Sequence, residues 1–297
     1  MFAQANLIAK EFTRPFIISS KMYNGQCNSG IGSFVIINED GWFGTAYHII
    51  QQTIDYTKSI SENNELLKKR KEIEDDVSIN NSVKKGRLNR LTIPPQAIIN
   101  YSVWLGHNDL SLDQVFILPE IDLAIGRLKN FTKDMVTTYP KFKDYTKSMD
   151  SGTSLCKLGF PFHSIILTFD EVNQSFRLPD GALPMPLFPL EGIFTRTVEF
   201  RDPTGKIKIP LKFIETSSPG LRGQSGGPTF DTHGTVWAIQ SQTKRYALGF
   251  GEKTNGLSTK AAEHLQNQYL NVGLGIHSET VIEFCRVNSI QIHISEY

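Results

Sequence analysis

The feature that most constrains this chain is a six-residue stretch, Gly223-Gln224-Ser225-Gly226-Gly227-Pro228, in which glycines surround a single serine. Glycine adopts backbone dihedrals that residues with a Cβ avoid, so the chain can turn sharply here. Such a turn can direct the backbone N–H groups of Gly223 and Ser225 toward one point, as in an oxyanion hole. The stretch suits the nucleophile of an acyl-transferring enzyme, but an ordinary hairpin loop fits it equally well.

The composition is typical of a soluble globular protein. The 297 residues suffice for one large domain or two small ones, and 39% hydrophobic with 21% charged residues fits a sizeable core. The net charge is +1, so no overall field favours nucleic acid or a membrane surface. The longest apolar runs, such as residues 34–37, are far too short to span a bilayer.

The N-terminus and the cysteines indicate a cellular location. The first ten residues lack a basic segment ahead of an apolar one, so they do not resemble a secretory signal. The three cysteines, Cys27, Cys156 and Cys285, are an odd number without metal-ligand spacing. We interpret them as free thiols in a reducing cytosol and expect a cytoplasmic protein. Because the histidines outside the motifs below show no metal-ligand spacing either, we expect no metal and no other cofactor.

Short β-rich runs separated by turns dominate the chain. Residues 33–37 and 42–46 are two such runs, and the Glu39-Asp40-Gly41 turn between them predicts a hairpin that delivers His48. Asp122 stands near the start of another apolar run, residues 121–128. Further strand-like or hairpin-like segments occupy residues 97–105, 114–118, 154–161, 192–200, 207–215 and 229–239.

These segments resemble the catalytic segments of trypsin-like serine proteases, in particular the bacterial HtrA/Deg-type domains. The hairpin ending in Thr45-Ala46-Tyr47-His48 resembles the first catalytic segment, and Asp122-Leu123-Ala124-Ile125 resembles the acidic one. Together with Ser225 they follow the chain order His, Asp, Ser of that family. The resemblance implies that Ser225 is the nucleophile, His48 the general base and then acid, and Asp122 the group that orients the imidazole. It also implies an oxyanion hole formed by the N–H groups of Gly223 and Ser225.

The resemblance implies an all-β, chymotrypsin-like fold of two antiparallel β-barrels packed side by side, with the site in the cleft between them. Residues 1–297 would form one protease unit, with a first barrel at 30–135 and a second barrel at 150–297 that ends in a C-terminal helix. Two inserted segments, 51–97 and 244–270, are expected to contain helix, the second within residues 260–270. Because acidic and basic residues are interleaved in segment 51–97, a solvated insertion is favoured over a nucleic-acid site.

The resemblance further implies a specificity pocket for the side chain that precedes the cleaved bond. Its predicted walls are Ser241-Gln242-Thr243 and Gly273-Leu274-Gly275, and its predicted floor is Ser218-Pro219. None of these positions carries a carboxylate, and Gln240 stands where glutamyl endopeptidases carry a histidine. We expect a neutral, apolar side chain in this pocket, because an unpaired buried charge is costly.

One departure from the secreted family members concerns activation. Those proteins carry Gly-Asp-Ser-Gly-Gly, and a new N-terminal ammonium pairs with the Asp, whereas here Gln224 takes its place. The serine loop must therefore be ordered in another way. We expect the intact chain to be competent without N-terminal processing, with segments 51–97 and 244–270 as candidates for regulation. HtrA-type members usually continue into a peptide-binding PDZ module, and here we expect a free-standing protease domain.

The sequence thus predicts a serine endopeptidase that hydrolyses protein or peptide substrates through an acyl-enzyme, and it leaves a regulatory protein partner open. One alternative is a protease-fold binding or scaffold protein that no longer cleaves. A second alternative is an esterase, because Gly-x-Ser-x-Gly also fits residues 223–227. The β-rich pattern and the order His, Asp, Ser argue against an α/β-hydrolase, in which the serine precedes the acid and the histidine.

Overall fold

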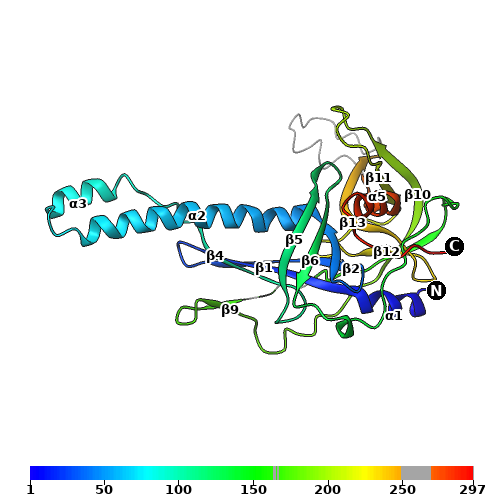
Figure 1. The fold of residues 1–297 in the computed structure, drawn as a ribbon, viewed down its shortest axis with the longest axis horizontal. Helices are drawn as coiled ribbons and strands as arrows, with labels where there is room; N and C mark the ends of the chain where they lie inside the picture. The colour runs from blue at the N-terminus through cyan, green and yellow to red at the C-terminus, as the bar shows by residue number, and fades with distance from the viewer. Residues whose placement is uncertain (163–164, 166, 249–268, 297) are drawn as a thin grey trace, which may run out of the picture.

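The computed structural model describes residues 1–162, 165, 167–248 and 269–296, and antiparallel β-strands form most of it (Figure 1). The strands build two six-stranded units and one small hairpin. The larger units contain runs of β-branched and aromatic residues, such as Phe34-Val35-Ile36, which pack well on a pleated surface. A short helix, α1 (Ala3–Phe12), precedes the first strand.

The first unit is a six-stranded sheet with the order β4-β1-β2-β3-β6-β5, in which every neighbouring pair is antiparallel. Its strands are β1 (Thr13–Met22), β2 (Cys27–Ile36), β3 (Trp42–Ala46), β4 (Ile98–Trp104), β5 (Ser111–Leu118) and β6 (Leu123–Lys129). The first barrel was predicted to begin at residue 30. In the structure the first strand of this sheet already begins at Thr13. β1 belongs to it because β1 pairs with both β2 and β4.

The second unit is a closed barrel with the order β10-β11-β14-β13-β12-β7. Its strands are β7 (Ser154–Lys157), β10 (Leu190–Phe200), β11 (Leu211–Thr216), β12 (Pro228–Phe230), β13 (Val236–Ala247) and β14 (Tyr269–His277). The predicted C-terminal helix follows directly as α5 (Ser278–Val287). A separate hairpin of β8 (Thr168–Asp170) and β9 (Ser175–Arg177) lies between β7 and β10 in the sequence.

The two β-units share one hydrophobic core. Phe34 and Phe43 of the first sheet belong to the same buried cluster as Phe213 and Ile239 of the barrel. At Gly44 the units approach so closely that a Cβ would lie 2.6 Å from the Cδ1 of Ile239. The predicted all-β, chymotrypsin-like architecture is therefore confirmed, with the second unit closed and the first unit an open six-stranded sheet.

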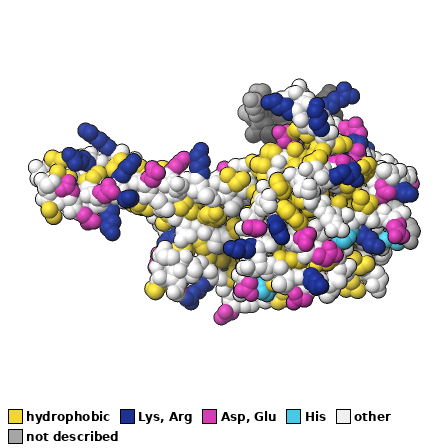
Figure 2. All heavy atoms as spheres, in the orientation of Figure 1, with side chains coloured by type: hydrophobic (Ala, Val, Ile, Leu, Met, Phe, Trp, Pro, Cys, Tyr) yellow, Lys and Arg dark blue, Asp and Glu magenta, His cyan; other side chains and the backbone are white. Residues whose placement is uncertain are grey.

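Segment 51–97 forms a helical arm that projects from the β-units (Figure 1). Most of α2 (Tyr47–Asp75) and all of α3 (Asn81–Leu88) lie in this segment. At the start of α3, the Asn80 side chain accepts a hydrogen bond from the Val83 N–H. Contacts with β4 hold α2 in place, since Asn63 Nδ2 donates to the Ile98 carbonyl at 3.0 Å. Lys, Arg, Asp and Glu side chains alternate over the face of the arm seen in Figure 2, as the charge pattern predicted.

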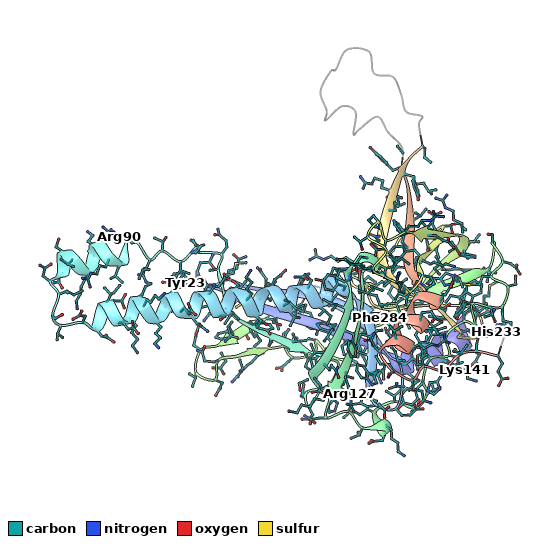
Figure 3. The ribbon with its side chains drawn as sticks, turned by 45° about the horizontal axis from the view of Figure 1, so that its top comes forward. Tyr23, Arg90, Arg127, Lys141, His233 and Phe284 are labelled. Carbon is teal, nitrogen blue, oxygen red and sulfur yellow. The ribbon has the colours of Figure 1, made fainter. Side chains whose placement is uncertain are left out.

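Segment 244–270 begins and ends as an extension of the β13–β14 hairpin, which rises from the barrel in Figure 3. Lys244 pairs with Val272, and Ala247 pairs with Tyr269. The helix predicted within residues 260–270 lies almost entirely outside the described residues, and Tyr269 and Leu270 at its end are in β14. None of the helices that the structure describes combines the length and the apolar character needed to cross a membrane.

Candidate active site

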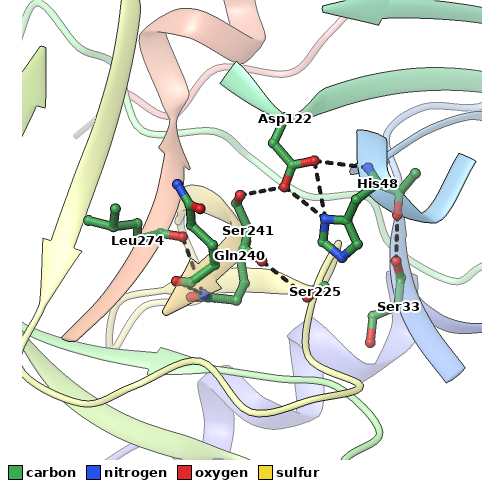
Figure 4. A network of polar contacts seen from close by, with 9 residues as sticks. Ser33, His48, Asp122, Ser225, Gln240, Ser241 and Leu274 are labelled. Atoms are coloured by element: carbon green, nitrogen blue, oxygen red, sulfur yellow. Dashed lines mark hydrogen bonds and ion pairs between the residues drawn. The ribbon is translucent and has the colours of Figure 1, made fainter. Parts of the chain in front are cut away.

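His48 and Asp122 are brought together by the pairing of β3 with β6. Ala46 pairs with Leu123, so the chain places the Tyr47 N–H against the Asp122 carbonyl at 2.8 Å. His48 then lies in the first turn of α2, and its backbone N–H donates to Asp122 Oδ1 at 2.9 Å. Its ring Nδ1 lies 2.9 Å from Asp122 Oδ2 and 3.1 Å from Oδ1 (Figure 4). Two atoms of His48 therefore bind the same carboxylate.

The Asp122 carboxylate is held in its ionised form. Burial alone would raise its pKa, but hydrogen bonds from His48 and from Ser241 outweigh this effect and lower the pKa below the usual value. The Ser241 hydroxyl donates to Oδ2 at 2.5 Å (Figure 4). An ionised Asp122 can accept a hydrogen bond from His48 Nδ1–H, and in that tautomer the lone pair of Nε2 is available as a base. The sequence placed Ser241 in the pocket wall and missed this second role of its side chain.

The serine loop is fixed at the boundary between the two β-units. The Ser33 N–H of β2 donates to the Ser225 carbonyl at 2.8 Å, and the Gly226 N–H donates to the Gln240 carbonyl at 2.7 Å. Gly226 has a φ of 84°, and a Cβ there would lie 2.0 Å from the Ser33 carbonyl oxygen. Only glycine suits such a position, so the glycines of the motif serve the turn that the sequence predicted.

The Ser225 hydroxyl lies on the same cavity as His48, but the two side chains are not hydrogen-bonded to each other within the described residues. Ser225 Oγ instead donates to the Ser241 carbonyl at 3.1 Å (Figure 4). A cavity of about 670 Å³ is lined by both Ser225 and His48. The structure thus joins His48 to Asp122 directly and places Ser225 beside them with its hydroxyl engaged elsewhere. Hydrogen bonds of catalytic groups are often incomplete until substrate binds.

The N–H groups of Gly223 and Ser225 are available to a ligand. In the part of the chain that the structure describes, neither N–H donates a hydrogen bond, and both residues line the 670 Å³ cavity. The Gly223 carbonyl is fixed by the Ser33 Oγ at 2.7 Å and by the Phe160 N–H at 3.0 Å. Two preorganised donors beside a serine are what an oxyanion hole requires.

Gln224 orders the loop without a charge. Its side chain is fully buried, its Oε1 accepts the Leu221 N–H at 3.0 Å, and its Nε2 donates to the Phe188 carbonyl at 3.2 Å. These bonds connect the two ends of the loop to each other and to the segment before β10.

Lys157 is a buried cation beneath the same loop, and its role was not predicted. Its Nζ donates to the Ser218 carbonyl at 2.7 Å, to Ser218 Oγ at 2.6 Å and to the Pro219 carbonyl at 3.4 Å. The side chain is 1% exposed, and burial lowers its pKa to about 8. The only signal in the sequence is a lysine inside the otherwise apolar run Leu155-Cys156-Lys157-Leu158.

The cavity beside the predicted pocket wall is small, about 90 Å³. Ser241, Gln242 and Thr243 line it, as predicted, together with Gly220, Leu221, Arg222, Ser225 and Gln240. The predicted floor and second wall do not line it, and these residues are Ser218, Pro219, Gly273 and Gly275.

The Gln240 side chain lines this cavity and is fixed by hydrogen bonds. Its Nε2 donates to the carbonyls of Gln242 and Leu274 at 3.1 and 3.2 Å. A Cβ on Gly220 would lie 2.3 Å from this nitrogen, so the amide fills the space up to the loop. The Gln240 Oε1 is buried and has no hydrogen-bond partner in the described residues. Gln240 and Ser225 both line the cavity of about 90 Å³.

Comparisons with known proteins found similar solved structures but no matching family model. No protein-family model and no curated protein matches the sequence. Among solved structures, the chain is similar to the Rv3671c protease from M. tuberculosis in its active form, with 12% identity and a TM-score of 0.47 over 98% of this chain and 86% of that one. It is also similar to the HtrA-type protease AlgW with a tripeptide, with 17% identity and a TM-score of 0.46. The match covers 96% of this chain but only 62% of the AlgW chain.

No metal centre accompanies these groups in the described part of the chain, where no three His, Cys, Asp or Glu side chains converge on one point. His277, for example, is a structural residue. Its Nδ1 accepts the Glu279 N–H at 3.0 Å at the start of α5, and burial lowers its pKa to about 4. A neutral, satisfied imidazole of this kind is not poised for catalysis.

Proposed function

We propose that this chain is a serine endopeptidase that acts through an acyl-enzyme, with protein or peptide substrates. The observation that carries the proposal is one cavity lined by His48, Gly223 and Ser225, in which the N–H groups of Gly223 and Ser225 donate no hydrogen bond within the described residues. Asp122 holds the other side of the His48 ring with two short contacts. A nucleophile, a base with an orienting acid, and an oxyanion site are the three parts that acyl transfer needs.

The proposed reaction proceeds in two halves. Ser225 Oγ attacks the peptide carbonyl carbon while His48 Nε2 takes its proton, and the N–H groups of Gly223 and Ser225 stabilise the oxyanion. The C–N bond then breaks, His48 returns the proton to the leaving amine, and the acyl group stays on Ser225. A water molecule, deprotonated by His48, attacks the ester in the same way and releases the carboxylic acid and the Ser225 hydroxyl.

A fluorophosphonate probe and a peptide assay test the proposal together. We expect the probe to label Ser225, and we expect Ser225→Ala and His48→Ala each to lower turnover at least ~10³-fold, because nucleophile and base act as a unit. The competing hypothesis, a silent binding protein, is supported by the hydrogen bond that holds the Ser225 hydroxyl on the Ser241 carbonyl. An unlabelled Ser225 together with no peptide hydrolysis would favour the silent protein.

For the pocket we propose a small, uncharged side chain that carries a hydrogen-bond donor. The cavity of about 90 Å³ beside Ser241 is much smaller than the cavity of about 670 Å³ beside His48, so we expect it to take a small side chain such as Thr or Val. The Gln240 Oε1 lacks a donor, and it would repel a carboxylate. No carboxylate is among the described residues that line the cavity, so Lys or Arg would lack an ion-pair partner there. We therefore keep the prediction that the pocket takes an uncharged side chain. We now propose that this side chain is polar instead of apolar.

Isosteric substrates test this preference. Thr and Val have the same shape, and a buried acceptor left without a donor costs about 1–3 kcal/mol, so we expect kcat/KM to favour Thr at least ~10-fold. Gln240→Met, which keeps the length of the side chain and removes the acceptor, should abolish the ratio. Equal rates for Thr and Val in the parent protein would refute the role of Gln240 while leaving the endopeptidase proposal intact.

A further inference from the structure

A cavity of about 530 Å³ is separate from the candidate active site, since neither His48 nor Ser225 lines it. Its walls come from the end of α1, the start of β1, the end of β4 and the segment before β10. Its volume falls within the roughly 300–1,000 Å³ that is typical of small-molecule sites. The apolar part of the lining consists of six side chains, those of Pro15, Trp104, Phe160, Leu183, Met185 and Leu187.

Packing holds these apolar walls in place. Phe160 and Met185 are 4% and 9% exposed and belong to one small hydrophobic cluster. Trp104 and Leu187 pack against the same cluster. The Trp104 Nε1 also donates to Asn108 Oδ1 at 2.9 Å, which fixes the indole ring. A preformed cavity with such walls suits a ligand that has an apolar body.

Two cationic residues, Lys10 and Arg14, also line this cavity. The Arg14 guanidinium donates to the carbonyls of Lys10, Thr13 and Met135 at 3.0–3.1 Å. These acceptors are neutral, and in the described part of the chain neither cation forms an ion pair with a carboxylate. Burial lowers the pKa of Arg14, and the nearby Glu11 carboxylate acts against this shift. The guanidinium is therefore partly desolvated without a direct counter-ion.

Glu11 is the one acidic residue among the described residues that line the cavity. Its Oε2 already accepts the Thr137 hydroxyl at 2.7 Å. The lining thus carries two cations and one carboxylate that is hydrogen-bonded elsewhere. Because a partly buried charge is stabilised by a partner of opposite sign, the charge pattern favours a ligand with an anionic head.

The walls of this cavity are bonded directly to the serine loop. The Phe160 N–H donates to the Gly223 carbonyl at 3.0 Å. Leu187 is followed by Phe188, whose carbonyl accepts the Gln224 Nε2 at 3.2 Å. A ligand that packs on Phe160 and Leu187 restricts both segments that hold the loop, so its binding favours the ordered loop.

We propose that this cavity binds a small amphipathic anion, with its apolar chain against the six apolar side chains and its head at Arg14 and Lys10, and that the bound molecule stabilises the ordered serine loop. The site itself does not depend on the proposed endopeptidase function. Only the effect on the reactivity of Ser225 rests on that function.

Isothermal titration calorimetry with octanoate as the probe tests the site. We expect octanoate to bind at least ~10-fold more tightly than octanol, because hydrogen bonds to charged groups are the stronger ones. Octylamine, with the same chain and a positive head, should bind more weakly than octanol. No binding of octanoate, or equal affinities for octanoate and octanol, would overturn the proposal.

Three variants locate the bound probe. Lys10→Gln should weaken octanoate binding several-fold, whereas Lys133→Gln removes the same charge from an exposed residue that does not line the cavity and should change nothing. Leu183→Trp places a larger side chain at a 41% exposed position of the lining and should abolish binding. Parent-like affinity in Leu183→Trp, or equal affinities in the two lysine variants, would overturn the proposal. So would a dimer in sedimentation that Leu183→Trp disrupts, because this face would then bind a second copy of the chain.

The rate at which a fluorophosphonate labels Ser225 tests the effect on the loop. Saturating octanoate should raise this rate several-fold in the parent and leave it unchanged in Leu183→Trp. An unchanged rate in the parent, with octanoate bound, would refute the connection between the cavity and the loop. If Ser225 is not labelled at all, the endopeptidase proposal fails, and the calorimetry still decides whether the cavity binds the anion.

Discussion

Replacing Lys157 by Met should change how the stability of this protein depends on pH. The Lys157 ammonium is 1% exposed and holds Ser218 and Pro219, which lead into the serine loop. Burial disfavours the charged form, so the pKa falls from its ordinary value of 10.5 to about 8 in the native protein. In the unfolded chain the amine is solvated and keeps the ordinary pKa. The two states therefore bind different numbers of protons over this pH range.

The sign of the effect follows from which state holds the proton. Between pH 8 and 10.5 the unfolded chain keeps the Lys157 proton and the native protein releases it, so the free energy of unfolding rises with pH. The difference in pKa corresponds to roughly 3 kcal/mol. Below pH 8 Lys157 is protonated in both the native and the unfolded state. Its contribution to the free energy of unfolding is then constant and at its lowest value. Cys156 acts in the opposite direction, because burial raises its pKa to about 11, but it is present in parent and variant alike.

Urea unfolding of the parent and Lys157→Met at pH 7.5, 9 and 10.5 measures the effect. We expect the free energy of unfolding of the parent, relative to the variant, to increase by about 3 kcal/mol across the series. Lys129→Met, at an exposed position of β6, controls for the loss of a lysine. A constant difference between the parent and Lys157→Met at all three pH values would refute the reasoning, because it would mean that Lys157 is not desolvated in the native protein.

Three further outcomes are expected. Ser241→Ala removes a donor to Asp122, so the Asp122 pKa should rise and kcat should fall about tenfold; an unchanged kcat would contradict this role. Gly226→Ala places a Cβ 2.0 Å from the Ser33 carbonyl oxygen at a φ of 84°, so urea unfolding should show a loss of several kcal/mol or no folded protein. The intact chain, with its start at Met1 confirmed by N-terminal sequencing, should hydrolyse peptides without processing. Trimming before Gly30 should abolish this activity because it removes β1, and activity that appears only after trimming would be evidence against self-ordering of the loop.

The parts of the fold that the sequence predicted have local signals. The alternation of apolar residues and turns marks the strands, and the Thr45-Ala46-Tyr47-His48 and Asp122-Leu123-Ala124 segments mark the residues that the β3–β6 pairing brings together. Glycines mark the loop around Ser225 because only they tolerate its dihedrals. Charge density likewise predicted a solvated insertion after residue 50.

The parts that were missed depend on contacts between distant segments. Lys157 reaches Ser218 across 61 residues, and the Ser241 hydroxyl reaches Asp122 across 119 residues. No local pattern reveals such contacts. Gln240 was noted for the residue that it replaces, but the sequence could not show that its amide reaches the Leu274 carbonyl and lies against Gly220. The wall that α2 adds to the cavity of about 670 Å³ was missed for the same reason, since it requires the helix to pass beside β2.

Ser241 connects the three parts of the site, and this connection offers a reason for the resting position of Ser225. Its hydroxyl supports Asp122, while its carbonyl accepts the Ser225 hydroxyl at 3.1 Å. A substrate strand that lies along Ser241-Gln242-Thr243 would present its own N–H groups to that same carbonyl. A backbone N–H that binds there displaces the Ser225 hydroxyl, which can then rotate toward His48 Nε2 in the shared cavity. For the proposed endopeptidase, substrate binding at the Ser241 carbonyl would therefore bring Ser225 and His48 together.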